Sequence, residues 1–167
     1  REHEQRGVEF MRTYLSQGPL AHFAEQAGLI QATNVALSIT DTLRGLPRQL
    51  LAIGQLLGTA DMVSQMAGRN YLERCHQFLF KEFVAAGVDR TVSPSGEITV
   101  LYATPDDLLR QTPIFYVHLV RRRLDEDFAR AYRYIAPHFG GDDPYGRAME
   151  RNLSHLMQLL DRLDRYG

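Results

Sequence analysis

Apolar residues recur every three or four positions along most of the chain, the spacing that gathers them on one face of an α-helix. Val8, Met11 and Leu15 show this spacing near the start of the chain. Glycine and proline separate such runs, and helices commonly end or begin at them. The pattern predicts helices over residues 3–16, 19–30, 33–44, 48–57, 59–67, 70–86, 105–111, 113–135 and 144–165.

Several of these boundaries rest on particular residues. Gly58 is expected to end one helix and Thr59 to cap the next. Thr104-Pro105 joins a capping threonine to a proline suited to the first helical turn, and Thr112-Pro113 repeats this arrangement before the long predicted helix. We therefore expect a new helix to begin at each of these sites.

The strand-like pattern of the chain lies between residues 88 and 102. β-branched residues stand on both sides of Ser93-Pro94-Ser95-Gly96, and this arrangement predicts two strands joined by a turn. Together with the helices, it predicts a mainly α fold, a single-domain helical bundle with one short β-hairpin.

The composition fits one globular domain over residues 1–167, with 44% hydrophobic and 23% charged residues. The 19 basic residues nearly balance the 20 acidic ones, so no overall field attracts polyanions or anionic membranes. No run approaches the roughly 20 apolar residues of a membrane span. The lone Cys75 cannot form an intramolecular disulfide, and we expect a cytoplasmic protein without membrane association.

Two further features concern the origin of the chain. Lys81 is its one lysine, a bias typical of GC-rich coding and so of a bacterial source. The sequence begins at Arg1 rather than at methionine, and we expect a fragment or a processed form of a longer protein.

The run Arg121-Arg122-Arg123 resembles a phosphate-binding patch when it is taken alone. Asp125, Glu126 and Asp127 follow each arginine by four positions, the spacing at which opposite charges pair along a helix. We therefore expect a neutralised, solvent-facing helix surface.

His138, Asp142 and Asp143 are the one compact set of potential metal ligands. Helix capping before Pro144 explains the two aspartates without an ion, and the histidines show no i, i+3 or i, i+4 pair. We expect neither metal nor cofactor. The common nucleophile and nucleotide-binding motifs are also missing, so catalysis is the less favoured interpretation, although distant residues can assemble a site without a linear signature.

The order of helices before the hairpin resembles a winged-helix module, and the junction from Val84 to Gly96 is similar to that of MarR-type regulators. The resemblance implies DNA binding as an alternative function. It assigns helices to residues 50–57, 59–66 and 71–85 and a wing to residues 88–102. The residues implied to face DNA share a polar character and are Asn70, Arg74, Gln77, Lys81 and Arg90.

The favoured interpretation is a non-catalytic binding or regulatory domain for a small ligand or a protein partner. Aromatic and histidine side chains predict a ligand pocket formed by His76, Phe80, Phe83, Phe115 and His118. The last helix carries apolar residues at alternating spacings of four and three, which predicts a seam for a homodimer. The seam comprises Met149, Leu153, Leu156, Leu160 and Leu163.

Overall fold

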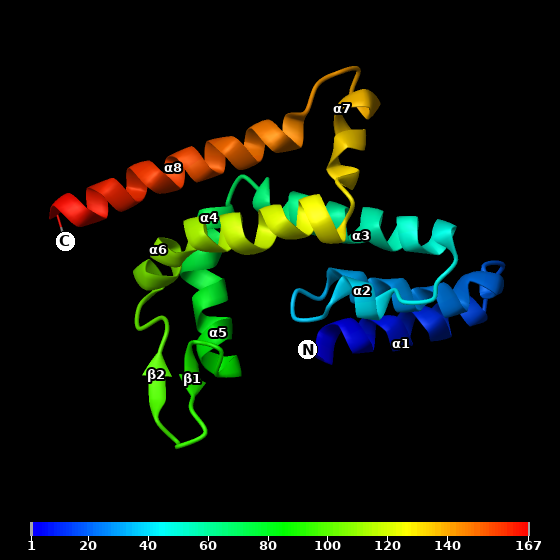
Figure 1. Ribbon diagram of the computed structural model, residues 1–167, viewed down its shortest axis with the longest axis horizontal. Helices are drawn as coiled ribbons and strands as arrows, with labels where there is room; N and C mark the ends of the chain where they lie inside the picture. Colours follow the sequence, from blue (N-terminus) through cyan, green and yellow to red (C-terminus); the bar gives the residue numbers. More distant parts are fainter. Residues whose placement is uncertain (1, 167) are drawn as a thin grey trace. The chain divides into compact units, whose positions relative to one another are not determined.

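The computed structural model describes residues 2–166 and confirms a mainly α fold with one short hairpin (Figure 1). The α-helices of the described residues are α1 (Glu2–Ser16), α2 (Ile39–Thr42), α3 (Arg48–Met66), α4 (Tyr71–Arg74), α5 (Phe80–Ala86), α6 (Pro105–Phe115), α7 (Ile135–His138) and α8 (Pro144–Tyr166). The 3₁₀ segments are η1 (Ala21–Thr33) and η5 (Ala131–Tyr134), and the π-helical segments are η2 (Cys75–Leu79), η3 (Tyr116–Arg121) and η4 (Arg123–Asp127). The strands are β1 (Arg90–Val92) and β2 (Ile98–Val100).

The chain forms two compact units, each built from two segments. Unit 1 contains Arg1–Val63 and Arg122–Asp142, and unit 2 contains Ser64–Arg121 and Asp143–Gly167. The last residues of α3 belong to unit 2 and the rest of that helix to unit 1.

In unit 1, α1 packs along η1, and small buried residues such as Ala24, Ala27 and Ala32 allow the close approach. The helices predicted over residues 19–30 and 33–44 differ from this structure. The first is a 3₁₀ helix that reaches Thr33, and the second shrinks to the single turn of α2, which Ser38 caps. Asn34 ends η1, because its backbone turns to an extended conformation.

The predicted break at Gly58 is wrong, because α3 runs unbroken through it. The Phe128 ring packs so closely against Gly58 that an added Cβ would overlap it, and the glycine therefore serves this contact. Thr59 is not a cap, since its hydroxyl donates to the Gln55 carbonyl oxygen within the same helix, at 2.8 Å.

The helix predicted over residues 113–135 is also wrong at both ends. Pro113 lies inside α6, and the chain continues through η3 and η4 as far as Asp127. A proline inside a helix removes one backbone hydrogen bond, and the wider π-helical turns begin soon after it. The helix then ends because Ala129 and Arg130 adopt positive φ angles of 50° and 60°.

The pair expected between Arg123 and Asp127 forms, with Nε and Oδ2 3.9 Å apart, but the expected solvent-facing surface is corrected by the position of Arg123. Its side chain is only 2% exposed and donates hydrogen bonds to the carbonyl oxygens of Asn34, Val35 and Leu37, at 3.0 to 3.3 Å. Burial lowers the pKa of Arg123 from its ordinary value. Arg123 is therefore an anchor for the loop that follows η1.

The neighbouring arginine behaves differently. Arg122 is half exposed and lies 3.9 Å from Asp127, five positions along the chain, instead of pairing with Glu126. A π-helical turn places residues i and i+5 on the same side, which explains the changed spacing.

In unit 2, the amphipathic helix α8 packs against α4 and α6. The predicted dimer seam is corrected here, because Leu156 and Leu160 are buried in a core with Leu72, Cys75 and Leu109. Leu153 and Leu163 are partly buried against this core, and Met149 is itself buried. The seam therefore packs against the core of its own chain.

The capping sites expected at Thr104 and before Pro144 form, whereas Thr112 is not a cap, because its hydroxyl donates to the Leu108 carbonyl oxygen inside α6. At the start of α6 the Asp107 amide donates to the Thr104 hydroxyl, while the Asp107 carboxylate accepts from the amide of Thr104 at 2.8 Å. At the start of α8 the Gly146 amide donates to the Asp143 carboxylate at 2.7 Å.

The capping box of α6 predicts a pH-dependent stability. Hydrogen bonds from Thr104 hold the pKa of Asp107 below its usual value. The ionised carboxylate therefore contributes fully to the free energy of unfolding above the unfolded pKa of about 4, and this contribution disappears as the pH falls through the lower folded pKa. Asp107→Asn should destabilise the protein by about 0.5–1 kcal/mol at pH 7 and by less at pH 3. Urea unfolding of unit 2 at both pH values measures this, with the exposed Glu150→Gln as control. If Asp107→Asn lowers the free energy of unfolding by the same amount at both pH values, the ionised carboxylate does not have this role.

Among residues 2–166, no helix combines the length and the apolar character needed to cross a membrane.

Candidate functional site

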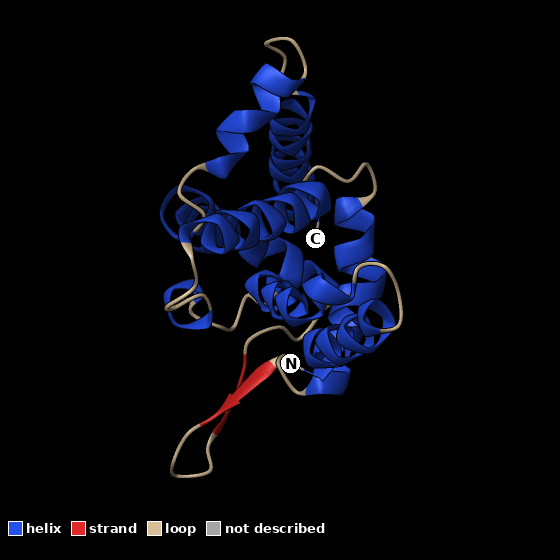
Figure 2. Ribbon diagram, turned by 90° about the vertical axis from the view of Figure 1, so that its right-hand side faces the viewer, coloured by secondary structure: helices blue, strands red, loops and turns tan. Residues whose placement is uncertain are grey.

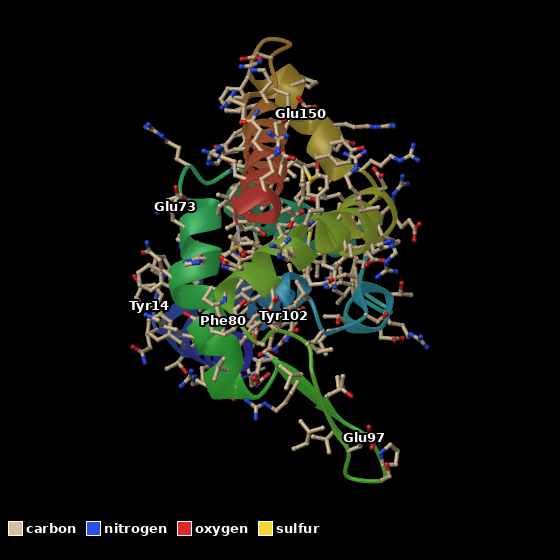
Figure 3. The ribbon with its side chains drawn as sticks, turned by 90° about the vertical axis from the view of Figure 1, so that its left-hand side faces the viewer. Tyr14, Glu73, Phe80, Glu97, Tyr102 and Glu150 are labelled. Carbon is tan, nitrogen blue, oxygen red and sulfur yellow. The ribbon has the colours of Figure 1, made fainter. Side chains whose placement is uncertain are left out.

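Unit 2 contains a small, mostly apolar pocket of about 70 Å³. One wall comes from the continuous helix of α4, η2 and α5, and the other from α6 and the residue that follows the hairpin. The lining residues are Tyr71, Cys75, Leu79, Phe83, Tyr102, Leu108, Gln111, Thr112 and Phe115. The Phe83 and Tyr102 rings meet at a centroid distance of 6.0 Å, and Figure 3 shows Tyr102 beside α5.

Tyr71 and Cys75 lie one helical turn apart on this wall and share a side-chain hydrogen bond. Burial raises the pKa of the Tyr71 hydroxyl and the pKa of the Cys75 thiol. Both groups therefore stay neutral at pH 7. A buried neutral thiol is a poor nucleophile, because the thiolate is the reactive form.

Two of the five residues predicted for a ligand pocket, Phe83 and Phe115, line this pocket. Phe80 is half buried but does not line it, and His118 is exposed. His76 is also exposed, and its Nε2 lies 3.2 Å from Oδ1 of Asp106. The predicted cluster is therefore only partly assembled.

The sequence interpretation missed the contribution of α6. Leu108, Gln111, Thr112 and Phe115 follow the spacing i, i+3, i+4 and i+7, which places them on one helical face. The predicted boundary between Gln111 and Pro113 divides these four residues between two helices, so the sequence pattern does not place them on one face. Tyr102 carries no comparable signal, since it belongs to a loop.

The hairpin extends away from the ends of α5 and α6 (Figures 1 and 2). Its antiparallel register pairs Arg90 with Val100 and Val92 with Ile98. Cross-strand partners share a face, so one face carries three β-branched apolar side chains. Val92, Ile98 and Val100 are 64%, 58% and 54% exposed, respectively.

Asp89 closes the base of this hairpin. Its backbone oxygen accepts hydrogen bonds from the amides of Leu101 and Tyr102 at 2.7 and 3.2 Å. Its buried carboxylate binds the Arg90 guanidinium, and these bonds hold the pKa of Asp89 below its ordinary value. Arg90, which the winged-helix resemblance assigned to DNA, is therefore engaged within the chain.

The other residues of the predicted DNA-binding face, Asn70, Arg74, Gln77 and Lys81, are all exposed. The winged-helix arrangement itself is wrong at its first two helices, because α3 joins them into one. A π-helical segment also interrupts the expected recognition helix. The required group of three separate helices before the hairpin does not form.

In the described part of the chain, no group of three histidine, cysteine or acidic side chains is arranged to hold a metal ion. At the loop of His138, Asp142 and Asp143, the last of these caps α8.

Comparison with known proteins finds no matching family model, no similar curated protein and no similar solved structure.

Proposed function

We propose that this chain is a non-catalytic binding domain that recognises an apolar segment of a partner protein through unit 2. The observation that carries the proposal is the exposure of Val92, Ile98 and Val100 on one face of the hairpin. A two-stranded hairpin is only marginally stable alone, and clustered exposed apolar side chains commonly mark interaction sites. The single cysteine favours the cytoplasm as the compartment.

The aromatic pocket supports a protein partner over a free small molecule. Its volume of about 70 Å³ fits one side-chain-sized group, whereas drug-sized ligands occupy larger cavities. Its lining contains no charged residue, so the group that it accepts should be uncharged and largely apolar. Tyr102 lies two residues after β2, which places the pocket close to the base of the hairpin.

Selection from a displayed library of random 12-residue peptides against the intact chain tests this proposal. We expect the selected peptides to be rich in apolar residues and to lose affinity for the triple variant Val92→Thr, Ile98→Thr, Val100→Thr. Threonine keeps the branching at Cβ and the strand propensity, but it replaces a methyl group of valine, or the ethyl group of isoleucine, by a hydroxyl. The expected loss is at least about tenfold, which corresponds to roughly 1.4 kcal/mol, when fluorescence anisotropy measures the dissociation constant.

The matched control alters the opposite face of the same strands, with Thr91→Val and Thr99→Val. These changes should leave the affinity within about twofold. The proposal fails if no peptide is selected, or if the selected peptides bind the triple variant and the intact chain equally. Saturable binding of small apolar compounds in place of peptides would favour the small-ligand alternative.

A further inference from the structure

The hydrogen bonding of the hairpin determines which backbone groups face outward. The amide of Leu101 donates to the Asp89 carbonyl oxygen, and the amide of Ser93 donates to the Glu97 carbonyl oxygen. In an antiparallel ladder, hydrogen-bonded and non-hydrogen-bonded pairs alternate. Thr91 and Thr99 therefore bond to each other across the ladder, while the residues on either side of them direct their backbone N–H and C=O groups away from the partner strand.

The outward-facing groups belong to the same residues that expose apolar side chains. On β2 they are the backbone groups of Ile98 and Val100, and on β1 those of Arg90 and Val92. An edge of this kind is a template for another strand, and natural proteins protect such edges with charges or proline. β2 carries neither within its three residues, Ile98–Val100.

The two edges of the hairpin differ in charge. On β1, the Arg90 side chain lies at the edge and is tied to Asp89 by a bond of 2.6 Å. On β2, both outward-facing residues are uncharged and β-branched. β2 is therefore the edge that an incoming strand meets without displacing an ion pair.

We propose that the outer edge of β2 binds an extended segment of a partner protein as a third strand. This inference rests on the proposed function and names its binding mode, in which main-chain hydrogen bonds supply affinity and alternate side chains supply specificity. The segment places β-branched or other apolar residues beside Ile98 and Val100. The exposed Glu97, which precedes β2, favours a basic residue at the corresponding end of the segment.

A second copy of the chain fits this edge less well than a peptide. Pairing of two β2 strands would join only three residues from each copy. Such a contact is well below the roughly 1,200 Å² that specific, stable protein interfaces bury. An extended peptide requires less buried area, because a weak and transient complex is sufficient for recognition.

Proline substitution separates the two edges. Ile98→Pro removes an outward-facing N–H of β2. Val92 is the cross-strand partner of Ile98, and Val92→Pro removes the equivalent N–H of β1. Neither donor belongs to the ladder of the hairpin, so both variants should retain it, which circular dichroism and slow exchange of the Thr99 amide would verify. The probe is the tightest-binding peptide from the selection described above.

We expect Ile98→Pro to bind this peptide at least about tenfold more weakly than Ile98→Thr, whereas Val92→Pro should bind it within about twofold of Val92→Thr. The loss of the apolar side chain is common to both members of each comparison, so the difference reports the backbone N–H. In the unmodified chain, the peptide should slow hydrogen exchange at the amides of Ile98 and Val100 but not at those of Arg90 and Val92. If peptides bind but neither effect occurs, the proposed function survives and the strand-addition mode is wrong. If no peptide binds, the proposed function itself fails. A sedimentation coefficient that rises with protein concentration would show self-association. If Ile98→Pro abolished that rise, a second copy would occupy the edge instead.

Discussion

Replacement of Arg123 by methionine should reduce the free energy of unfolding of unit 1 by about 3–5 kcal/mol, the cost typical of removing one partner from a buried charged network. Methionine fills much of the same space but donates no hydrogen bond. The carbonyl oxygens of Asn34, Val35 and Leu37 would then lose the donor that satisfies them. The guanidinium also lies 5.3 Å from the centre of the Phe128 ring, so a cation–π contact is lost as well.

The matched control is Arg122→Met, at the preceding position, where the side chain is half exposed. Exposed ion pairs contribute little, so this change should cost less than about 1 kcal/mol. Hydrogen exchange resolved along the chain measures unit 1 separately from unit 2, and the expected loss of protection is largest over residues 34–38. Arg123→Lys provides a milder variant if Arg123→Met does not fold, because lysine keeps the charge but not the planar fork of donors. Equal effects at positions 122 and 123 would contradict the anchoring role.

The sequence predicts well those features that depend on neighbouring residues. Thr104 and Asp107 form a capping box within four residues, and the turn at residues 93–96 joins two short strands. Each signal is local, since the donor and the acceptor, or the two strand ends, are close along the chain. Such features need no knowledge of the tertiary structure.

The role of Arg123 was not predictable in this way. Its acceptors lie 86 to 89 residues away along the chain, and its two arginine neighbours give the run the appearance of a solvent-facing patch. The apolar spacing of α8 likewise indicates a buried seam but not its partner, which proves to be the core with Leu72 and Leu109. Periodicity identifies the face that is buried, whereas the surface that covers it depends on packing between distant segments.

The candidate pocket shows the same division. Phe83 and Phe115 could be chosen because aromatic residues favour pockets, and the structure brings both to one cavity. His76 and His118 were chosen as polar groups, but their helical positions turn them to solvent. The π-helical segments η2 and η3 alter the angular spacing on both helices, and a sequence pattern based on 3.6 residues per turn does not include this change.

Gly58→Ala should destabilise unit 1 by about 1–3 kcal/mol, the cost typical of overpacking a core. Helix propensity alone predicts the opposite sign, because alanine is favoured over glycine by about 1 kcal/mol inside a helix. The steric effect dominates here. An added Cβ would overlap two ring atoms of Phe128, which is 1% exposed, and would lie 3.0 Å from the Ala32 carbonyl oxygen. The ring is enclosed and the carbonyl belongs to the backbone, so neither group can move away easily.

Gly54, one turn earlier in the same helix, is the matched control. A Cβ at this position would meet mainly the flexible end of the Leu43 side chain, at 2.9 Å, so the gain in helix propensity should offset most of the strain. Phe128→Leu combined with Gly58→Ala should recover part of the loss relative to the sum of the two single changes, because the smaller side chain leaves room for the methyl group. Urea unfolding measures the free energy for Gly58→Ala, Phe128→Leu and their combination, which form the double-mutant cycle, and for the control Gly54→Ala. Stabilisation by Gly58→Ala, or strict additivity in the cycle, would show that the ring does not require glycine at this position.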